Sequence, residues 1–583
     1  MSTDPGDDRP VGRRLPLADA LAPPGGVAAP SSVLIPDDEV VPQAARSARQ
    51  RPTIFTEPRR LLVLVGLITL VGFLLRLPSF HDSLATDEIS TYYIVVGNSL
   101  GRVLQLVNSD QELTPPLFFI LAWATKGLLA SPSESIRLVS LATGTAAIPL
   151  TFVLGVRTVG RRAALVGASC VALSPFMIFY SSEARTFMLV LFLALVSTLA
   201  LIRALDTGRV LWWVVYAVCT SAAAYSHYSV AFYLVVQLGW ALWTQPRAWR
   251  PLVVTNMAAV LTYIPWLGGL RADLHAPNLT SAIFPVTFAN VVGSHEVFWI
   301  GHPLIPPHVL PGTAAIVLAA AGLLIGLVGV VLRRRGDRPW WRLAPRTALV
   351  VALTAGPAAL IVVYSIVRVD VLGGPNVIAS WPPMALLIGA LVTGPPKPVR
   401  AAAVLLTVVA FAIGGLRMLS PSAQRADVGA VVAYLDRHGA PGDPVVDASL
   451  TAKPLTELDV ALANAGQSDR YRVIRLGSPP LSEVLPYFAG PNPQPLQFFL
   501  PVAAPRTIAQ QAVAEARRGR LFLVTLEASP SAYAVYSHAA AAVVPFIGSL
   551  PKGYRQVAYR SFPADGGALS EVVFEFRYTT SGH

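Results

Sequence analysis

Three short segments of the chain carry side chains that could do chemistry. The first lies between residues 79 and 114 and is rich in acids: His81, Asp82, Asp87, Glu88, Asp110 and Glu112. The other two are Tyr180-Ser181-Ser182-Glu183-Ala184-Arg185 and Ser226-His227-Tyr228. Carboxylates can accept a proton or hold a divalent cation, and a guanidinium can bind a phosphate.

Each of these segments also has a purely structural interpretation. Acids in a loop are ordinarily solvated, Glu183 and Arg185 can pair to close a turn, and a histidine can lie at a lipid interface. Asp87 and Glu88, however, follow soon after a long apolar run. A carboxylate close to lipid is costly unless it has a partner or a task, which favours a functional interpretation.

The elements that position these segments are membrane spans. The chain has 583 residues, of which 54% are hydrophobic and 13% charged, with a mean hydropathy of +0.55, whereas soluble domains carry roughly 25% charged residues. Apolar runs near the ~20 residues that cross a bilayer recur from Leu61 to Leu419, and mixed polarity follows Ser420. We therefore expect a polytopic α-helical membrane protein with a C-terminal soluble α/β domain.

The apolar runs predict about eleven transmembrane helices. They lie at approximately 61–77, 136–156, 163–180, 186–204, 211–226, 228–244, 252–269, 309–332, 347–367, 376–394 and 400–418. The segment Pro115–Ala130 is short, opens with two prolines and contains Lys126, so we assign it to a helix that lies along the membrane or dips into it. This choice puts the arginine-rich loops in the cytoplasm, as the positive-inside rule requires. All three chemistry-bearing segments then share the external side.

The predicted organisation has three parts. Residues 1–57 are a disordered cytoplasmic tail, 58–419 a transmembrane domain with a first external loop at 79–135, and 420–583 an extracytoplasmic α/β domain. In the last part the patterns predict two helices and two strands: Val428–His438, Pro444–Asp447, Arg506–Arg518 and Leu521–Thr525.

The positions of the charged residues and of the cysteines argue against a nucleic-acid-binding protein and against a disulfide-rich or cysteine–metal protein. The net charge of +12 comes from arginines in short loops between apolar runs, which reflects membrane topology and not a nucleic-acid partner. Cys170 and Cys219 both fall inside apolar runs, which argues against a disulfide framework or a cysteine metal site. Scarce lysine beside abundant arginine indicates a high-GC bacterium, and so a multi-pass protein of the bacterial plasma (inner) membrane.

Several runs resemble a known family in their order and spacing. Arg137-Leu138-Val139-Ser140, Val159-Gly160-Arg161-Arg162-Ala163-Ala164, Leu173-Ser174-Pro175-Phe176 and the run from Tyr180 to Arg185 are similar to the signature of the dolichyl-phosphate-mannose protein mannosyltransferase-like superfamily. This GT-C glycosyltransferase group includes protein O-mannosyltransferases, the lipid A aminoarabinose transferase and the rhizobial galacturonosyltransferases. Asp87-Glu88 resembles the acidic pair of the family's first external loop, and Ser226-His227-Tyr228 its T-H-Y. The resemblance covers about residues 61–418.

The chain departs from the family pattern at two places. Glu112-Leu113-Thr114-Pro115-Pro116-Leu117 resembles the element D-x-H-P-P-L, with Glu for Asp and Thr for His. The family often has an arginine before a late span that is thought to meet the donor phosphate. Here the corresponding run, Gly374-Pro375-Asn376-Val377, lacks it, and Arg368 or Arg185 is the candidate substitute.

The resemblance implies a polyprenyl-phosphate sugar donor and assigns roles to the candidate residues. Asp87 and Glu88 are the catalytic candidates, with Asp87 as the base that takes the acceptor's proton. Four residues are candidates for the donor and its phosphate: Arg185, Arg137, His227 and Tyr228. Glu112, Glu183 and Tyr180 support them, with Glu183 holding Arg185. If a divalent cation takes part, Glu88, Glu112 and Glu183 offer oxygen ligands for Mg²⁺ or Mn²⁺.

The expected reaction transfers a sugar, mannose or arabinofuranose, to a cell-envelope acceptor that is protein, lipid or polysaccharide. The partners are then the lipid-linked donor, this acceptor and membrane lipid, without nucleic acid. Two alternatives stay open: a non-catalytic GT-C-like scaffold for envelope assembly, and a polytopic lipid or sugar transporter. The clustering of ionisable residues at one face, instead of mid-span, argues against the transporter.

Overall fold

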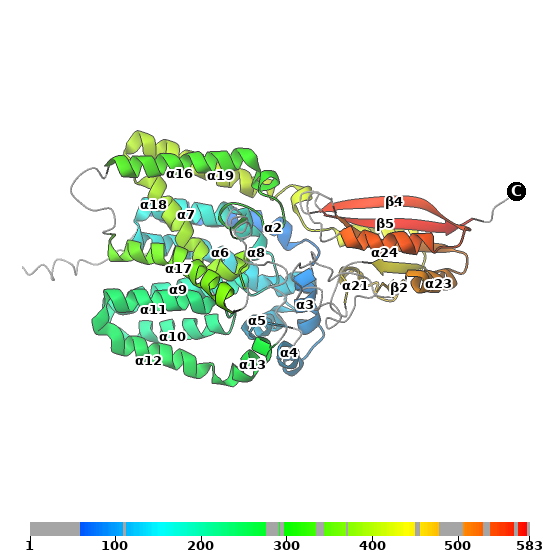
Figure 1. Ribbon diagram of the computed structural model, residues 1–583, viewed down its shortest axis with the longest axis horizontal. Coiled ribbons are helices and arrows are strands. Elements are labelled where there is room, and N and C mark those ends of the chain that lie inside the picture. The colour runs from blue at the N-terminus through cyan, green and yellow to red at the C-terminus, as the bar shows by residue number, and fades with distance from the viewer. Residues whose placement is uncertain are drawn as a thin grey trace, which may run out of the picture. The chain divides into compact units, whose positions relative to one another are not determined.

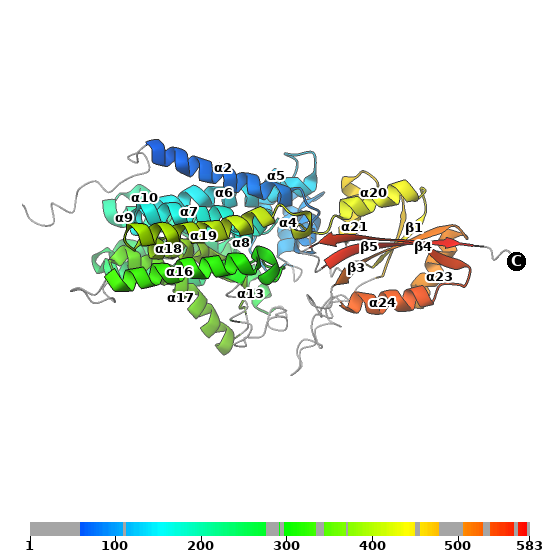
Figure 2. The same ribbon diagram turned by 90° about the horizontal axis from the view of Figure 1, so that it is seen from above.

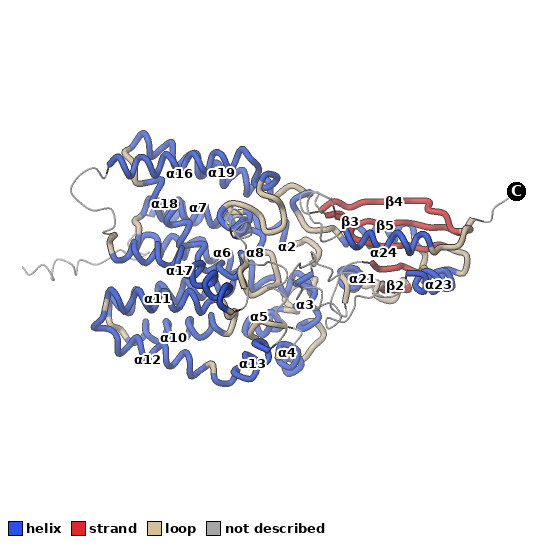
Figure 3. Tube along the Cα trace, in the orientation of Figure 1, coloured by secondary structure: helices blue, strands red, loops and turns tan. Residues whose placement is uncertain are grey.

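The computed structural model describes residues 59–84, 86–108, 112–275, 291, 297–333, 343–368, 371–448, 455–476, 505–528, 537–564 and 569–579. The predicted tail 1–57 and Asp110 lie outside these residues. Figure 3 shows that helices form the larger part of the described chain and that the strands all belong to the C-terminal region.

Helices occupy all eleven predicted spans. They are α2 (Arg59–Phe80), α6 (Pro132–Thr158), α7 (Arg161–Leu173) with α8 (Pro175–Ser181), α9 (Phe187–Thr207), α10 (Val210–Ala224), α11 (Val230–Thr244), α12 (Trp249–Thr262), α16 (Thr313–Arg333), α17 (Pro345–Val367), α18 (Trp381–Thr393) and α19 (Lys397–Arg417). In the described chain, eight helices are long and apolar enough to cross a membrane, and the pair α7 and α8, bent by 59°, makes a ninth. The helices α10 and α11 are apolar but shorter. The prediction of a polytopic α-helical membrane protein is confirmed.

The bend between α7 and α8 has a local cause. Pro175 starts α8 and has no backbone N–H, so the helix breaks there and leaves carbonyl groups of α7 without intrahelical donors. The fully buried guanidinium of Arg76, on α2, donates to the carbonyls of Val171 and Ala172, each at 3.1 Å. It also donates to Ser181 Oγ at 2.9 Å. Arg76 thereby fixes the chain just before the second chemistry-bearing segment.

Three short helices form the part of the chain between α2 and α6: α3 (Thr86–Val95), α4 (Leu100–Val107) and α5 (Leu117–Thr125). They share a hydrophobic cluster that includes Ile89, Val103 and Phe118, and Figure 1 shows them at one end of the long helices. The nine residues of α5 span only about 14 Å at ~1.5 Å per residue, less than half of a ~30 Å bilayer core. This length agrees with the predicted non-crossing helix.

The basic segments meet at the other ends of the spans. Arg346, at the start of α17, pairs with Asp206 at 2.5 Å and donates to the carbonyl of Arg157 at 3.3 Å. Thr347 donates to the carbonyl of Thr158 at 3.4 Å. These contacts join the C-terminal ends of α6 and α9 to the N-terminal end of α17, whereas the chemistry-bearing segments adjoin the opposite ends.

The C-terminal region folds as a five-stranded mixed sheet with helices on both faces. Its strands are β1 (Pro444–Ala448), β2 (Arg472–Arg475), β3 (Arg520–Ala528), β4 (Tyr554–Ala564) and β5 (Leu569–Tyr578), in the order β2-β1-β3-β5-β4. Its helices are α20 (Val428–His438), α21 (Glu457–Asn464), α23 (Pro505–Ala516) and α24 (Ser537–Gly548). The strand β1 runs parallel to β2 and β3, and β5 runs antiparallel to β3 and β4.

Alternating side chains of these strands build two separate cores. Val446 and Leu523 pack on the face of α23, whereas Val445 and Phe522 pack on the face of α20. Figure 2 shows α20 and α24 on opposite sides of the sheet. The predicted α/β fold is confirmed, and its four predicted elements correspond to α20, β1, α23 and β3.

The remaining short elements connect these parts. They are η2 (Pro246–Ala248), η3 (Ile264–Trp266), α13 (Leu267–His275), η4 (His308–Gly312), η5 (Gly374–Ser380) and η6 (Pro421–Ala423). The chain leaves α19 at Arg417 and enters α20 at Val428, so about ten residues join the last span to the sheet region.

Candidate functional site

The three chemistry-bearing segments meet at one end of the helices. Ala184 donates its backbone N–H to Glu88 Oε1 at 2.6 Å, which joins the second segment to the first. Thr186 Oγ1 donates to the carbonyl of Ser226 at 2.7 Å, which joins the second segment to the third. A fourth segment, which follows α19, enters through Arg425, whose side chain pairs with Glu88. The structure therefore brings together the segments that the sequence analysis selected.

Glu88 lies at the centre of a fully buried ion pair. Its two oxygens accept hydrogen bonds from Arg137 Nε at 2.7 Å and NH2 at 2.6 Å, and neither side chain is exposed. Burial acts to raise the pKa of this carboxyl, but the guanidinium groups of Arg137 and Arg425 hold it at about 2. Glu88 is thus a charged structural anchor on α3, with both oxygens engaged.

Every N–H group of the Arg137 guanidinium donates to another group of the protein. Besides pairing with Glu88, its guanidinium donates to the carbonyls of Phe80 at 3.0 Å, Asp82 at 2.5 Å and Ser83 at 2.9 Å. These bonds tie the end of α2 and the start of the first loop to α6. The sequence analysis proposed Arg137 for the donor phosphate; the structure gives it no exposed surface toward a ligand.

Arg185 forms the second arginine–carboxylate pair of the site. It donates to Glu112 Oε2 at 2.8 Å and Oε1 at 3.1 Å, in place of the expected partner Glu183. Thr114, which stands where the family has histidine, donates to Glu112 at 2.8 Å, and Ser90 donates to it at 3.3 Å. Burial acts to lower the pKa of Arg185, but the carboxylates of Glu112 and Asp87 raise it above its ordinary value. Arg185 is therefore a permanent cation.

Asp87 and Glu183 both interact electrostatically with Arg185 but have different surroundings. Asp87, in the first turn of α3, is exposed, whereas Glu183 is buried and its Oε2 has no hydrogen-bond partner in the described structure. Burial raises the pKa of Glu183 to about 8, and the negative charges of Asp87 and Glu88 add to this rise against the lowering by Arg425 and Arg185. The site therefore has one exposed acidic side chain, that of Asp87, and one buried carboxyl group, that of Glu183, whose raised pKa favours the protonated form at neutral pH.

His227 is held as a neutral ring. Its Nδ1 accepts the backbone N–H of Ser229 at 3.2 Å, so Nε2 carries the proton. Burial and the charge of Arg185 lower the pKa of His227 to about 4, and its ring lies 5.7 Å from that of Phe187. His227 can donate a hydrogen bond to a phosphate, but it carries no positive charge at neutral pH.

Tyr228 and Tyr180 serve as packing and hydrogen-bonding residues around the site. The hydroxyl of Tyr228 donates to Asp273 on α13 and accepts from Trp266 Nε1 at 3.0 Å. Tyr180 is buried, with its ring 4.8 Å from that of Phe176 and in edge-to-face geometry. The Tyr228 hydroxyl thus connects the third segment to α13 through its hydrogen bond to Asp273.

Arg425 is the functional candidate that the sequence analysis missed. Its backbone N–H donates to Asp82 Oδ2 at 3.2 Å, and its guanidinium pairs with Glu88 and lies 4.8 Å from the ring centre of Phe179. Arg368, the proposed substitute for the missing family arginine, is exposed at the end of α17. A basic residue that closely follows the last span, on the predicted external side, was the only available signal.

The proposed metal ligands do not form a metal set. Among the described residues, no group of three or more His, Cys, Asp and Glu side chains is placed to hold a metal ion. Glu88 and Glu112 each face an arginine, and a guanidinium occupies the position that a cation would take. The donor set formed with Glu183 therefore does not fit Mg²⁺ or Mn²⁺.

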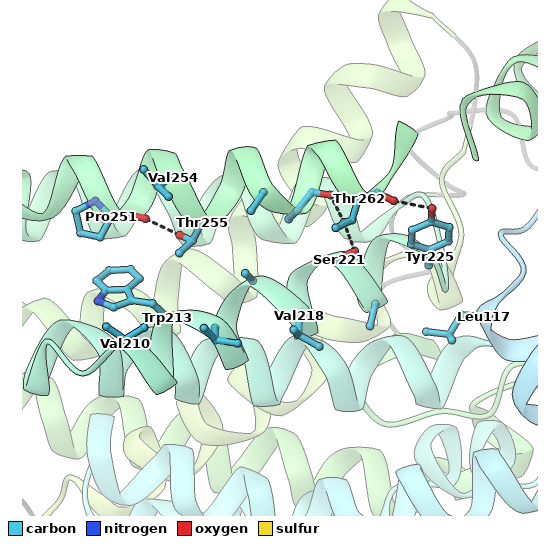
Figure 4. Close-up of a pocket in the computed structure, with 15 residues that line it drawn as sticks. Leu117, Val210, Trp213, Val218, Ser221, Tyr225, Pro251, Val254, Thr255 and Thr262 are labelled. Atoms are coloured by element: carbon cyan, nitrogen blue, oxygen red, sulfur yellow. Dashed lines mark hydrogen bonds between the residues drawn. The ribbon is translucent and has the colours of Figure 1, made fainter. Parts of the chain in front are cut away.

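An apolar groove of about 710 Å³ lies between α10 and α12. Figure 4 shows Trp213 and Val254 facing the groove, with Tyr225 and Leu117 at one end of it. Leu117 donates its backbone N–H to the carbonyl of Tyr225 at 3.0 Å. The groove thus ends next to Ser226 and His227, at the third chemistry-bearing segment.

Residues 114–270 match the family described as dolichyl-phosphate-mannose-protein mannosyltransferase. The likeness is to this segment, which is less than half of the chain. The match confirms the resemblance inferred from the motifs, and it contains Arg137, Glu183, Arg185 and His227. No curated protein matches the chain in sequence.

Solved structures of two other proteins align with most of the chain. ArnT from Cupriavidus metallidurans, bound to undecaprenyl phosphate, is 15% identical with a TM-score of 0.40, and the alignment covers 88% of this chain and 97% of that one. The oligosaccharyltransferase AglB from Archaeoglobus fulgidus, in complex with an inhibitory peptide and a dolichol-phosphate, is 11% identical with a TM-score of 0.41 and coverages of 80% and 69%. At such low values this likeness carries no argument about activity, and the mannosyltransferase-family segment is the finding that bears on it.

Proposed function

We propose that the protein is a membrane glycosyltransferase that transfers a sugar from a polyprenyl-phosphate donor to a cell-envelope acceptor. The observation that carries the proposal is the position of Asp87, an exposed carboxylate beside the cation Arg185 at the end of the helices where four segments meet. The family segment supports the same conclusion, because the family's name describes an enzyme that uses a sugar attached to a lipid phosphate.

In the proposed reaction, Asp87 acts as the base. The oxygen of the acceptor hydroxyl forms a bond to the anomeric carbon, and its proton passes to the Asp87 carboxylate. The bond between the anomeric carbon and the phosphate oxygen breaks, and its electron pair stays on the phosphate. The developing negative charge needs a preorganised cation or hydrogen-bond donor.

Arg185 is the proposed cation for the leaving phosphate. Glu112 holds its guanidinium through two hydrogen bonds and is itself oriented by Thr114 and Ser90, so the geometry is fixed before the donor binds. Neutral His227 adds a hydrogen-bond donor at Nε2. Arg137 and Glu88 act one layer deeper, where they hold α3 and thereby the position of Asp87.

The apolar groove between α10 and α12 is the proposed place of the donor's prenyl chain. Its lining is almost wholly apolar, and its end at Tyr225 adjoins the segment that carries His227. A prenyl chain in the groove would leave its phosphate near His227 and Arg185. We further propose mannose or arabinofuranose as the sugar, and an orientation in the bacterial inner membrane with residues after Ser420 outside the cytoplasm.

The test is transfer by the full-length protein in lipid nanodiscs. Radiolabelled polyprenyl-phosphate mannose and polyprenyl-phosphate arabinofuranose are supplied with cell-envelope polysaccharide, and label in the polymer is counted. Asp87→Asn should lower the rate at least ~100-fold, as expected for loss of a general base. Asp469→Asn, which changes an exposed aspartate of the sheet region, should transfer normally. Full activity in Asp87→Asn overturns the assignment of the base, and no transfer by the unaltered protein supports the non-catalytic alternative.

A further inference from the structure

A polar cleft of about 690 Å³ separates the first loop from the sheet region. One wall comes from the residues around Asp82 and from the start of α6, and the other from the segment after α19, from α21 and from β4. Cavities of about 300–1,000 Å³ are typical of small-ligand sites. The family segment 114–270 contains little of this cleft, and none of the roles assigned above uses it.

Hydrogen bonds between the two walls hold the cleft open in one geometry. Ser83 Oγ accepts the first backbone N–H groups of α20, from Val428 at 3.1 Å and Gly429 at 3.4 Å. At the other end, Asn464 Nδ2 donates to Ser133 Oγ at 2.7 Å. The first loop therefore caps a helix of the sheet region, and the walls are joined on both sides of the space between them.

The charges of the lining favour a neutral ligand. Three carboxylates reach the cleft, from Asp82, Glu134 and Asp427. Of its basic side chains, Arg425 is already paired with Glu88, and His81 contacts Glu134 at 2.9 Å. This excess of negative charge repels a phosphate, so the lipid-linked donor does not fit here. Carboxylate, amide and hydroxyl groups match the hydroxyl groups of a sugar, because each can accept or exchange hydrogen bonds with them.

Two residues of β4 distinguish a glycan from a peptide. β4 is at an edge of the sheet, where a peptide could add as a further strand. Pro563 lines the cleft at this edge and supplies no backbone N–H for such pairing. Its neighbour Phe562 offers an aromatic side chain, on which the C–H face of a sugar ring can pack.

We propose that this cleft binds a neutral oligosaccharide, the acceptor of the proposed transfer. That the oligosaccharide is the acceptor rests on the proposed function. The cleft is connected to the candidate site by two hydrogen-bonding contacts. Asp82, in the cleft wall, accepts the backbone N–H of Arg425, whose side chain pairs with Glu88. These contacts connect the cleft wall to α3, the helix whose first turn carries Asp87.

The test compares two tryptophan substitutions, one in the last turn of α21 and one at the residue that follows this helix. Ala465 lines the cleft, whereas Ala463 is exposed and lies outside the lining. In full-length protein in nanodiscs, saturation-transfer NMR measures binding of mannohexaose, of an arabinofuranose hexasaccharide and of a 12-residue Thr/Pro-rich peptide. We expect one hexasaccharide to bind the unaltered protein and Ala463→Trp equally. It should bind Ala465→Trp at least ~10-fold more weakly, since the indole takes up part of the space that the ligand needs.

Three outcomes overturn the inference: binding of the peptide alone, binding of neither hexasaccharide, or equal binding to both tryptophan variants. Titration with undecaprenyl phosphate separates this result from the donor assignment. The lipid should bind all three proteins equally, because the cleft excludes anions. If the unaltered protein binds a hexasaccharide but not undecaprenyl phosphate, the proposed donor is contradicted and the proposed glycan cleft is not.

Discussion

Two arginine–carboxylate pairs lie at the same end of the helices but differ in burial and in neighbours. In the pair of Arg137 and Glu88, both side chains have 0% exposure. In the pair of Arg185 and Glu112, the arginine is 13% exposed and the carboxylate 4%. The first pair is surrounded by backbone carbonyls and a second arginine, whereas the second lies next to Asp87.

The difference separates a structural role from a chemical one. Burying two charges costs several kcal/mol for each ion, and only additional hydrogen bonds offset this cost. The three carbonyls around Arg137 provide them and leave that guanidinium no capacity for a ligand. Arg185 keeps part of its surface accessible, so its charge is available to a phosphate. We therefore propose that the same residue types perform different tasks at this end of the helices.

Removal of Arg137 should have the largest effect on stability. Arg137→Met leaves Glu88 buried with Arg425 as its remaining charged partner and releases the carbonyls of Phe80 and Ser83, so we expect a loss of about 3–5 kcal/mol. Unfolding by SDS in mixed micelles measures it. Arg185→Met is the matched control, and its loss should stay below about 2 kcal/mol, because Glu112 keeps the hydrogen bonds from Thr114 and Ser90. Equal losses would contradict the comparison.

Removal of the Arg185 charge should have the largest effect on activity that leaves the fold intact. Arg185→Gln should lower the transfer rate about 100- to 1,000-fold, the range for loss of one preorganised group that stabilises a developing anion. Arg185→Lys restores the charge without the two parallel hydrogen bonds to Glu112, so its rate should be intermediate. The kcat and KM for the donor are measured separately in nanodiscs. A change in KM alone would assign Arg185 to ground-state binding.

Much of the fold could be predicted because it depends on local pattern. Hydropathy predicted the spans, and the helix Val428–His438 was predicted with the bounds of α20 from its residue pattern. The span 163–180 was predicted without its bend, which the structure places at Pro175, a residue without a backbone N–H. Such features need only the residues of one segment.

The pairing of the charged residues could not be predicted in the same way. Glu183 is two residues from Arg185, but the carboxylate that pairs with this arginine belongs to Glu112, which lies 73 residues away in the chain. Arg425 reaches Glu88 across more than 300 residues. These contacts depend on how the helices pack, which sequence spacing does not encode. Sequence spacing located the segments of the site, but it did not show which arginine each of Glu88, Glu112 and Glu183 pairs with, if any.

Replacement of Glu183 should have the smallest effect on stability at neutral pH. It extends the comparison to a carboxyl group that forms no ion pair with Arg185. Its pKa is raised to about 8 in the folded protein, against an ordinary value of about 4.3. For a carboxyl group whose pKa rises on folding, the contribution to stability is complete below the unfolded pKa and is lost as pH rises through the folded one. The unaltered protein should therefore lose stability between about pH 4.5 and 8, and Glu183→Gln should lose less. Melting temperatures at pH 5, 7 and 9 measure this difference, and parallel curves would show that Glu183 is ionised in the folded protein throughout, like Glu88.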